Sequence, residues 1–437
     1  MSITHQRVTV LRNSDSNSLS FRNAQYRMLF AAMFCYLFFY TGRQTFGFAI
    51  PGIQAEFGAS KETLGWVSAA LLWCYAVGQA INGNIGDKFG GRRVMSAGAI
   101  LSCVTNWAVS FSTSIFSLGA LWGLNGYFQA MGWAPGSRLL SNWFGKHERG
   151  KIFGFYVFAA GMASVLSFVT SILVVHIWQL DWRWIFRLPV LLMLVGGIAF
   201  YLIARERPED MGFASPHDDA DDDDDDAGSA GTDTESSWQR YKAVLSNWRL
   251  MLGSLAIGFQ NSARYGLLVW VPVHFLGSDG AGAGASSSFI DPQWISVALP
   301  IGMAIGAATN GWVSDNVFGS KRYLAIVLYM ALATVTSLFM YTIPASDVYL
   351  GIATLFLCGF FVYGPQSSFW ALCPDLVGHK RAGTATGIMN FFAYLFAGLG
   401  EPLIGGFMDT HHDTSLVFLI VAAASAASAT VALFIRR

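Results

Sequence analysis

Two arginines, Arg43 and Arg264, lie within stretches of sequence that are otherwise almost entirely apolar. Arg43 occurs in CYLFFYTGRQTFGFAIP and Arg264 in FQNSARYGLLVWVPVHFL, the first long hydrophobic segment of each half of the chain. An arginine at the centre of a membrane helix costs on the order of 3 kcal/mol, so it usually faces something useful. The planar guanidinium pairs well with phosphate and carboxylate groups. The two arginines therefore predict a clamp for a small anion in the middle of a membrane.

Other polar side chains in the apolar segments could shape the selectivity of such a site. Asn261 lies about one turn before Arg264, and Gln79 lies in the second hydrophobic segment. Either amide could donate a hydrogen bond to an anion, or it could simply hold helices together. Asn106, Asn125 and Gln129 are further candidates of this kind.

Glu401, in LFAGLGEPLIGGF, is the only carboxylate deep in the last two hydrophobic stretches. An ionisable residue inside a membrane segment suggests a function, here coupling to protons or to substrate. Because Pro402 follows it, Glu401 could instead form a structural ion pair or mark a helix bend. The sequence leaves both alternatives open.

The composition of the whole chain indicates that these residues lie in a membrane protein. The chain has 437 residues, of which 54% are hydrophobic and 12% charged, whereas soluble domains carry roughly 25% charged residues. Hydrophobic windows of about 20 residues recur, which is the length that a bilayer requires of a helix. We expect an all-α membrane protein with about twelve transmembrane helices. The predicted spans are residues 28–50, 64–84, 94–113, 116–138, 152–175, 184–204, 249–276, 293–314, 322–343, 347–370, 382–405 and 414–435.

The basic residues predict the orientation of these spans. Lys and Arg gather before the first span and after the second, fourth, sixth, eighth, tenth and last. By the positive-inside rule, both termini are expected in the cytoplasm of a cell whose plasma (inner) membrane the chain crosses many times. The polar N-terminus shows no short apolar core with a cleavage site, so the first span is expected to remain.

An acidic, low-complexity segment divides the chain into two halves. We expect a cytoplasmic tail over 1–27, a six-helix half over 28–205, a largely disordered cytoplasmic linker over 206–248 and a second six-helix half over 249–437. GNIGDKFGGRR, at 83–93, matches NGWVSDNVFGSKR, at 310–322, in an equivalent place of each half. Matched halves are typical of transporters that rock about a site at the midplane. The residues of this repeat expected to bias gating, by pairing with helix ends and loops, are Asp87, Arg92, Asp315 and Lys321.

Several classes of protein are not indicated. Five single cysteines lie in apolar segments without CxxC spacing, so no metal site, disulfide framework or cofactor is expected. No P-loop, nucleophile elbow or dinucleotide fingerprint is present, so we do not expect an enzyme. The expected partners are a small anion and membrane lipid, without nucleic acid, and the chain is expected to act as a monomer.

The chain resembles the major facilitator superfamily and, within it, the organophosphate:phosphate antiporters, which include carriers of glycerol-3-phosphate, hexose phosphates and phosphoglycerate. The resemblance covers residue 26 to the end. It is carried by YTGRQTFGFAIP, NGYFQAMGWAPGSRLLSNWFGKHERGKIFG, RERPEDMGF, ARYGLLVWVP, GWVSDNVF and VYGPQSSFWALCPDLVGHKRAGTATG.

The resemblance implies that Arg43 and Arg264 hold the phosphoryl group. Family tyrosines near the site match Tyr36, Tyr40, Tyr75, Tyr363 and Tyr394. A tyrosine offers a hydroxyl donor on an apolar ring, which suits a partly dry anion site.

Two positions depart from the family pattern. A lysine of the second helix, found in glycerol-phosphate and hexose-phosphate carriers, aligns with Gln79. A histidine of the fifth helix in the glycerol-phosphate carrier aligns with Ala160. Both changes remove a positive or protonatable group, so the substrate could be a less charged phosphate ester, a carboxylate, a phosphonate or a sulfonate.

The resemblance implies a secondary active transporter that works by alternating access and exchanges an organic anion for inorganic phosphate. One alternative is proton-coupled symport of an organic anion through Glu401. Another is a transporter-like sensor that binds a ligand and signals to a partner, for which the acidic linker is the candidate segment.

Overall fold

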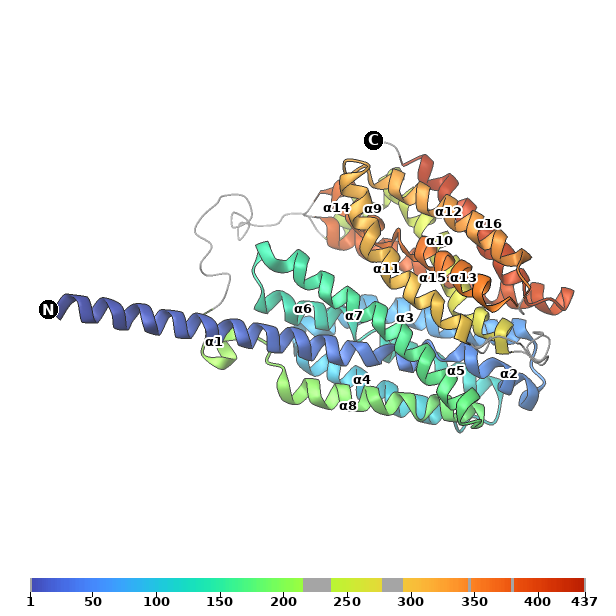
Figure 1. Cartoon of the computed structure of the whole chain (residues 1–437), viewed down its shortest axis with the longest axis horizontal. Coiled ribbons are helices and arrows are strands. Elements are labelled where there is room, and N and C mark those ends of the chain that lie inside the picture. Colours follow the sequence, from blue (N-terminus) through green and yellow to red (C-terminus); the bar gives the residue numbers. More distant parts are fainter. Residues whose placement is uncertain (1, 215–236, 277–293, 345–346, 379–380, 436–437) are drawn as a thin grey trace.

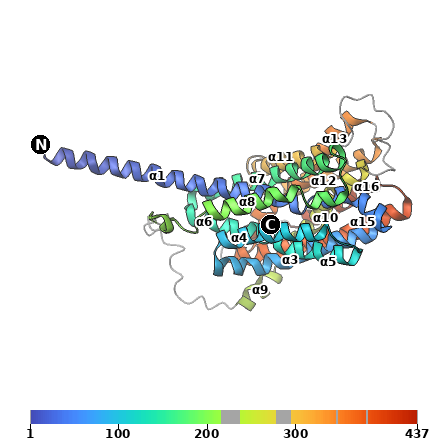
Figure 2. The same ribbon diagram turned by 90° about the horizontal axis from the view of Figure 1, so that it is seen from below.

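The computed structural model describes residues 2–214, 237–276, 294–344, 347–378 and 381–435, and all regular structure in these ranges is helical. The helices lie roughly along one direction in two bundles, with the first half of the chain below the second in Figure 1. Figure 2, turned by 90°, shows the same alignment, with α1 projecting beyond the bundle.

The first bundle contains α1 (Ser2–Phe39), η1 (Tyr40–Gly42), α2 (Phe46–Phe57), α3 (Lys61–Phe89), α4 (Gly91–Val109), α5 (Ile115–Gln129), α6 (Trp133–Trp143), α7 (Lys146–Ile172), η2 (Leu173–Ile177), η3 (Trp182–Phe186), α8 (Pro189–Ile203) and η4 (Pro208–Met211). The second contains α9 (Ser237–Leu245), α10 (Trp248–Leu276), α11 (Ile295–Asn316), α12 (Arg322–Thr342), α13 (Val348–Tyr363), α14 (Gln366–Val377), α15 (Ala382–His411) and α16 (Leu416–Leu433).

Each predicted span coincides with helical structure. Among the described residues, 7 segments are long and apolar enough to cross a membrane on length and composition alone. The other five predicted spans fall on α1–α2, α3, α4, α5–α6 and α10. The all-α membrane fold is therefore confirmed.

The first predicted span, 28–50, is not one helix. It is broken between Phe39 and Phe46, where a short 3₁₀ turn is followed by irregular backbone at Arg43, Gln44 and Thr45. The fourth and tenth spans are also divided, into α5 and α6 and into α13 and α14. The helix also starts earlier than predicted, at Ser2, within the expected tail.

The expected linker is only partly within the described residues. Its centre, 215–236, lies outside them, but both of its ends are helical, as η4 and α9. Two contacts explain this order: Asp210 accepts a hydrogen bond from the backbone N–H of Arg207 at 3.1 Å, and Asn247, just after α9, donates one to the carbonyl oxygen of Leu376 at 3.1 Å. Helical structure is thus present at both ends of the predicted linker.

The two halves meet closely at the end of the molecule opposite the linker, which we call the sealed end. There α3 packs along α15, and α2 packs against α10. Lys61 approaches Asp409 at 3.8 Å, and the same carboxylate accepts a hydrogen bond from the backbone N–H of Glu62 at 2.9 Å. Nearer the middle of the membrane, the indole of Trp73 donates to the carbonyl oxygen of Leu395 at 3.3 Å.

At the opposite end, the linker end, the first repeat motif is held by a residue that the sequence analysis did not single out. Glu206 accepts hydrogen bonds from the backbone N–H groups of Gly91 and Arg92, at 2.9 and 3.0 Å, and so caps the start of α4. The side chain of Arg92 donates to the carbonyl oxygen of Tyr201 at 2.8 Å. The side chain of Asp87 is outside the described set, and α3 contains its backbone.

In the second motif, Asp315 pairs with Arg322, not with Lys321. Ser320 also donates to Asp315 at 3.0 Å, and Arg322 lies 3.7 Å from Asp375 of α14. Lys321 is exposed at the start of α12. Arg322, rather than its neighbour in the motif, therefore makes the connection between helix ends.

Candidate anion-binding site

The break in the first span presents Arg43 from an irregular backbone. Arg43 has φ −142° and ψ −25°, outside the helical region, and the backbone N–H groups of Arg43 and Gln44 both bond to the carbonyl oxygen of Tyr40, at 3.1 and 2.9 Å. The carbonyl of Gly42 instead accepts hydrogen bonds from the side-chain amides of Asn125 at 2.7 Å and Asn106 at 3.2 Å. Side chains of α4 and α5 thus replace the missing helical bonds.

A small polar network stabilises these two amides. Ser102 donates to Asn125 at 2.6 Å, Asn106 donates to Asn125 at 3.0 Å, and Gln129 donates to Ser102 at 2.8 Å. A Cβ atom at Gly42 would lie 2.6 Å from the Gln129 amide nitrogen, so only glycine fits against this network. Of these candidates for direct binding on sequence grounds, Asn106 and Asn125 thus act on the backbone beside Arg43, and Gln129 supports them through Ser102.

The guanidinium of Arg43 lies over two aromatic rings, 4.0 Å from the centroid of Tyr40 and 4.8 Å from that of Tyr75. Arg43 itself is 8% exposed. Rings in this position attract the cation without neutralising it. The arrangement keeps a full positive charge in the protein interior.

Arg264 is presented differently, from the middle of the uninterrupted helix α10. Its guanidinium lies 4.2 Å from the ring centroid of Tyr363 and 5.0 Å from that of Tyr265, and the residue is 5% exposed. One turn earlier, Gln260 donates to the carbonyl oxygen of Val362 at 2.8 Å, which fixes α10 against α13.

Asn261 is buried, but its amide nitrogen is engaged within α10. It donates to the carbonyl oxygen of Ile257 at 3.1 Å and to the side chain of Gln260 at 2.9 Å. Both contacts are structural ones within α10, and they engage the amide nitrogen that direct binding of an anion would require.

The tyrosines connect the two arginines. The rings of Tyr75 and Tyr394 lie 4.6 Å apart across the two halves, and Tyr394 in turn lies 5.8 Å from Tyr265. Tyr40, beneath Arg43, is also a neighbour of Arg264. The arginine–tyrosine cluster, which we define as Arg43, Arg264, Tyr40, Tyr75, Tyr265, Tyr363 and Tyr394, is therefore one site built by both halves.

Tyr36 lies behind this cluster. Its ring is 5.8 Å from that of Tyr40 and 4.9 Å from that of Tyr156, which stacks on Trp133 at 4.9 Å. The sequence analysis missed Tyr156 and Tyr265. Tyr265 could have been found, because it directly follows Arg264 and a buried cation favours aromatic neighbours.

Polar atoms without partners gather at the same place. Among the described residues, the Nε atoms of Arg43 and Arg264 have no hydrogen-bond partner, and neither do the side-chain amide of Gln44 and the hydroxyl of Thr45. Buried polar groups are normally satisfied, so an unsatisfied set around two guanidinium groups has the chemistry of a site that takes an anion or water.

The two positions that depart from the family pattern flank the cluster. Gln79 is half-buried in α3, one turn after Tyr75, and Ala160 is buried in α7, one turn after Tyr156. Neither side chain brings a charge. The positive charge of the cluster therefore comes from its two arginines.

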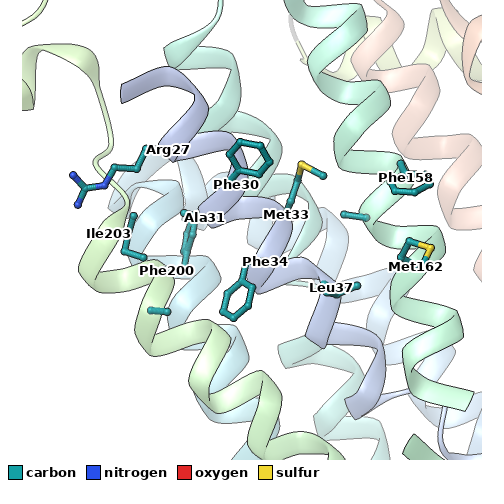
Figure 3. Close-up of a pocket in the computed structure, with 12 residues that line it drawn as sticks. Arg27, Phe30, Ala31, Met33, Phe34, Leu37, Phe158, Met162, Phe200 and Ile203 are labelled. Atoms are coloured by element: carbon teal, nitrogen blue, oxygen red, sulfur yellow. The ribbon is translucent and has the colours of Figure 1, made fainter. Parts of the chain in front are cut away.

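Glu401 lies apart from the cluster. It is seven residues after Tyr394 in α15, about 10 Å along the helix towards the sealed end. Its side chain is fully buried, and Trp270 of α10 lies beside it. Elsewhere, a groove of about 740 Å³ between α1, α7 and α8 is lined by apolar side chains such as Phe30, Phe34 and Met162 (Figure 3). The groove contains neither arginine of the pair.

A comparison with known families agrees with this architecture. The family model described as Major Facilitator Superfamily matches residues 32–401 and again 285–437. The chain belongs to the Major Facilitator Superfamily. It is therefore a member of a family of transporters, and not an enzyme. No group of His, Cys, Asp and Glu that could hold a metal ion occurs among the described residues.

Individual relatives confirm the resemblance to carriers of phosphate esters. This facilitator is 28% identical over 402 residues to the glycerol-3-phosphate transporter of Bacillus subtilis (strain 168), a match that covers 88% of this chain and 87% of that protein. It is 27% identical over 403 residues to the membrane sensor protein UhpC of Escherichia coli (strain K12), covering 90% and 88%. The structure of a bacterial homologue of the human lysosomal transporter Spinster, inward-facing and occupied, aligns with a TM-score of 0.68 at 13% identity over 93% of both chains.

Proposed function

We propose that this facilitator carries a small organic phosphate across the membrane, in exchange for inorganic phosphate, by alternating access. The observation that carries the proposal is the arginine–tyrosine cluster: each half supplies one buried guanidinium, Arg43 or Arg264, and the two share a set of tyrosines. The name of the Bacillus subtilis relative supports the class of substrate.

The cluster suggests how exchange would be coupled. Two like charges in a site of low dielectric constant repel each other, and an anion between them removes that repulsion. Binding then draws the halves together and lowers the barrier to the conformational switch, because the ligand favours the closed arrangement. An empty carrier keeps the repulsion and switches slowly, so one anion leaves as another enters.

Phosphate exchange in proteoliposomes tests the proposal. Vesicles loaded with phosphate are given radiolabelled phosphate outside, and uptake is compared between the wild type, Arg43→Lys and Arg264→Lys. Lysine keeps the charge but loses the planar fork that binds two phosphate oxygens. We expect a loss of at least tenfold in each variant.

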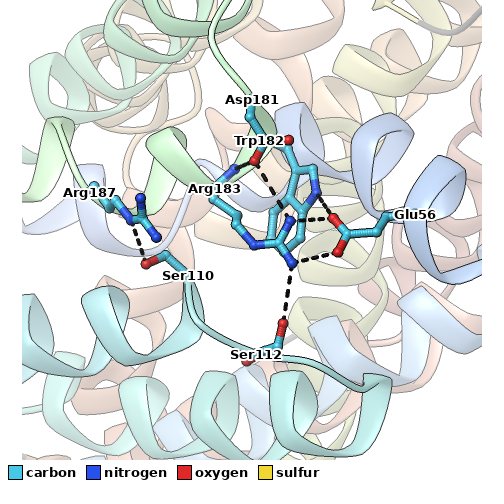
Figure 4. A network of polar contacts seen from close by, with 7 residues as sticks. All are labelled: Glu56, Ser110, Ser112, Asp181, Trp182, Arg183 and Arg187. Atoms are coloured by element: carbon cyan, nitrogen blue, oxygen red, sulfur yellow. Dashed lines mark hydrogen bonds and ion pairs between the residues drawn. The ribbon is translucent and has the colours of Figure 1, made fainter.

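Arg187→Lys provides the matched control. Arg187 donates to Ser110 at 2.8 Å at the sealed end, away from the cluster (Figure 4), so this variant is expected to exchange normally. Uptake that is equal in wild type and both cluster variants would contradict the proposal. Uptake by wild-type vesicles without internal phosphate would instead indicate uniport or symport.

A second candidate is a sensor that binds the anion without transporting it. The similarity to the membrane sensor protein UhpC favours this candidate. Equilibrium binding of phosphate that requires Arg43 and Arg264, in a protein that gives no exchange, would support it over transport.

A further inference from the structure

Glu401 is a fully buried carboxylate, and none of the described cations pairs with it. The indole N–H of Trp270 lies beside it, but neither carboxylate oxygen makes a hydrogen bond of normal geometry to this group or to any other described residue. Buried polar side chains are almost always satisfied, so this pair requires an explanation. The arginine–tyrosine cluster does not supply one, since it lies about 10 Å away along α15.

Glu401 lies where the two halves of the molecule meet. Gly65 of α3 packs directly on the backbone of α15 at Glu401 and Pro402: a Cβ atom at Gly65 would lie 2.5 Å from the Pro402 Cα and 2.6 Å from the Glu401 carbonyl oxygen. One turn to either side, Gly398 and Gly405 also lie against α3, so the face of α15 that carries Glu401 is turned towards α3. Trp270, of the same half as Glu401, lies beside it.

We call the contact between α3 and α15 at the sealed end the seam. The charged groups of these two helices pair with one another further along it. Lys61 and Glu62, at the start of α3, meet Asp409 of α15. Asp409 follows Glu401 by eight residues, about 12 Å along the helix. None of the described hydrogen bonds or ion pairs of these residues reaches Glu401.

The charged groups of α10 and α16 do not compensate Glu401 either. His274 of α10 bonds to Thr414 at 2.9 Å, beyond Trp270 on the side of the sealed end. Arg264 precedes Trp270 by six residues, about 9 Å, and stacks on Tyr363. The helix α16 contains no titratable side chain over Leu416–Leu433.

We infer that Glu401 is a proton-binding site that exists only while the sealed end is closed. An ionised carboxylate without a cation to pair with is costly in an apolar contact, so the closed seam holds the neutral acid. When α3 moves away from α15, water reaches the carboxylate, and the proton passes to the solvent. Acid therefore favours the closed seam. For one linked proton, the equilibrium constant for opening falls by up to about tenfold for each pH unit of acidification.

Hydrogen exchange of the two seam segments tests this site without any substrate. The purified full chain in lipid nanodiscs is compared with Glu401→Gln, which mimics the neutral acid, at matched values from about pH 8 to about pH 5. Peptides that cover 61–72 and 400–411 report opening of the seam. We expect wild type to exchange faster than Glu401→Gln at high pH, and the ratio to approach one as the pH falls.

Glu62→Gln is the matched control, since it removes an exposed carboxylate at the same end, and it should keep the wild-type response to pH. The infrared spectrum gives a second readout: wild type should show the carbonyl stretch of a protonated carboxylic acid that Glu401→Gln lacks. Trp270→Phe, which removes the neighbouring N–H group, should shift that band. This variant provides the infrared test if Glu401→Gln does not fold.

An identical response of wild type and Glu401→Gln to pH, or an absent acid band, would overturn the inference. Neither readout uses phosphate or the two arginines. Failure of phosphate exchange would therefore leave this proton site intact, and failure of the proton site would leave the proposed exchange intact.

Discussion

The side-chain amide of Asn125 donates a hydrogen bond to the carbonyl oxygen of Gly42 at 2.7 Å. Through this bond, a residue of α5 holds open the break in the first span from which Arg43 emerges. The broken first span thus supplies the charge of Arg43, and side chains of α4 and α5 hold the backbone that positions it.

Asn125→Ala should therefore weaken anion binding without removing a charge. The carbonyl of Gly42 would keep only the longer bond from Asn106, and losing a buried hydrogen bond costs about 1–3 kcal/mol. We expect the KM for phosphate exchange to rise about tenfold. Asn310→Ala is the control: Asn310 is a buried amide of the second half that bonds Ser367 and Ser368. An equal effect of both changes would show a general loss of packing.

Gly42→Ala tests the same break by steric means. The added methyl group would lie 2.6 Å from the Gln129 amide nitrogen and 2.9 Å from Met193. We expect a fall in phosphate exchange of tenfold or more, on the scale of about 1–3 kcal/mol for overpacking. The double variant Gly42→Ala, Gln129→Ala should regain part of the activity, as measured by initial rates in proteoliposomes. No recovery would mean that Gln129 is not the obstacle.

Two substitutions of Tyr363 separate the contribution of its ring from that of its hydroxyl group. Tyr363→Leu removes the ring that lies 4.2 Å from Arg264, whereas Tyr363→Phe keeps it. Because a buried cation–π contact contributes about 1–2 kcal/mol, we expect phosphate affinity to fall about tenfold in the Leu variant and much less in the Phe variant. The same two changes at Tyr349, an exposed residue at the opposite end of the same helix, should both leave the affinity unchanged.

Glu56 forms an ion pair with Arg183 at the sealed end, outside the predicted span 28–50 (Figure 4). This pair gives a prediction about the effect of pH on stability. A hydrogen bond from Arg183 lowers the pKa of this carboxyl below its ordinary value, and a bond from Trp182, at 2.9 Å, acts in the same direction. A carboxyl with a lowered pKa stabilises the folded state above the pKa of the unfolded chain. That contribution disappears as the pH falls through the folded value, which lies below the ordinary glutamate pKa.

Glu56→Gln should therefore lower the Tm modestly at neutral pH, since exposed ion pairs are weak. The difference from wild type should vanish in acid, once Glu56 is protonated in the folded as well as in the unfolded chain. Thermal unfolding in detergent, followed by circular dichroism across this range, measures both values. Glu209→Gln, a change at an exposed carboxylate of η4, is expected to leave the Tm unchanged at neutral pH. A difference that persists in acid would exclude the ion pair as its cause.

Residue type made part of the site predictable. An arginine in an apolar segment is visible in any sequence, and so are tyrosines that match a family pattern, so the sequence could identify most members of the cluster. The break at Arg43 was not predictable, because YTGRQT contains no proline and lies between two apolar stretches that together have the length of one span. Its cause is tertiary, since amides from α4 and α5 compete with the helical bonds of Gly42.

The same limit applies to the roles of the polar residues. Asn106, Asn125 and Gln129 were recognised as unusual, but a sequence does not say whether an amide faces a ligand or a backbone carbonyl. The capping of α4 by Glu206 was missed because its partners, Gly91 and Arg92, lie more than a hundred positions away. The helices at the predicted spans were predictable because each is set by local composition.

The contrast between the broken first span and the unbroken α10 has a consequence for biogenesis. Arg43 cannot reach its final geometry when its own helix enters the membrane, since Asn106 and Asn125 have not yet been synthesised. Arg264 emerges already oriented by the helix that carries it. Tyr394, which bridges the two halves, arrives last of all. Nascent chains that end before α15 would thus contain both guanidinium groups without this bridging ring, and the newborn protein would acquire its anion chemistry only near the end of translation.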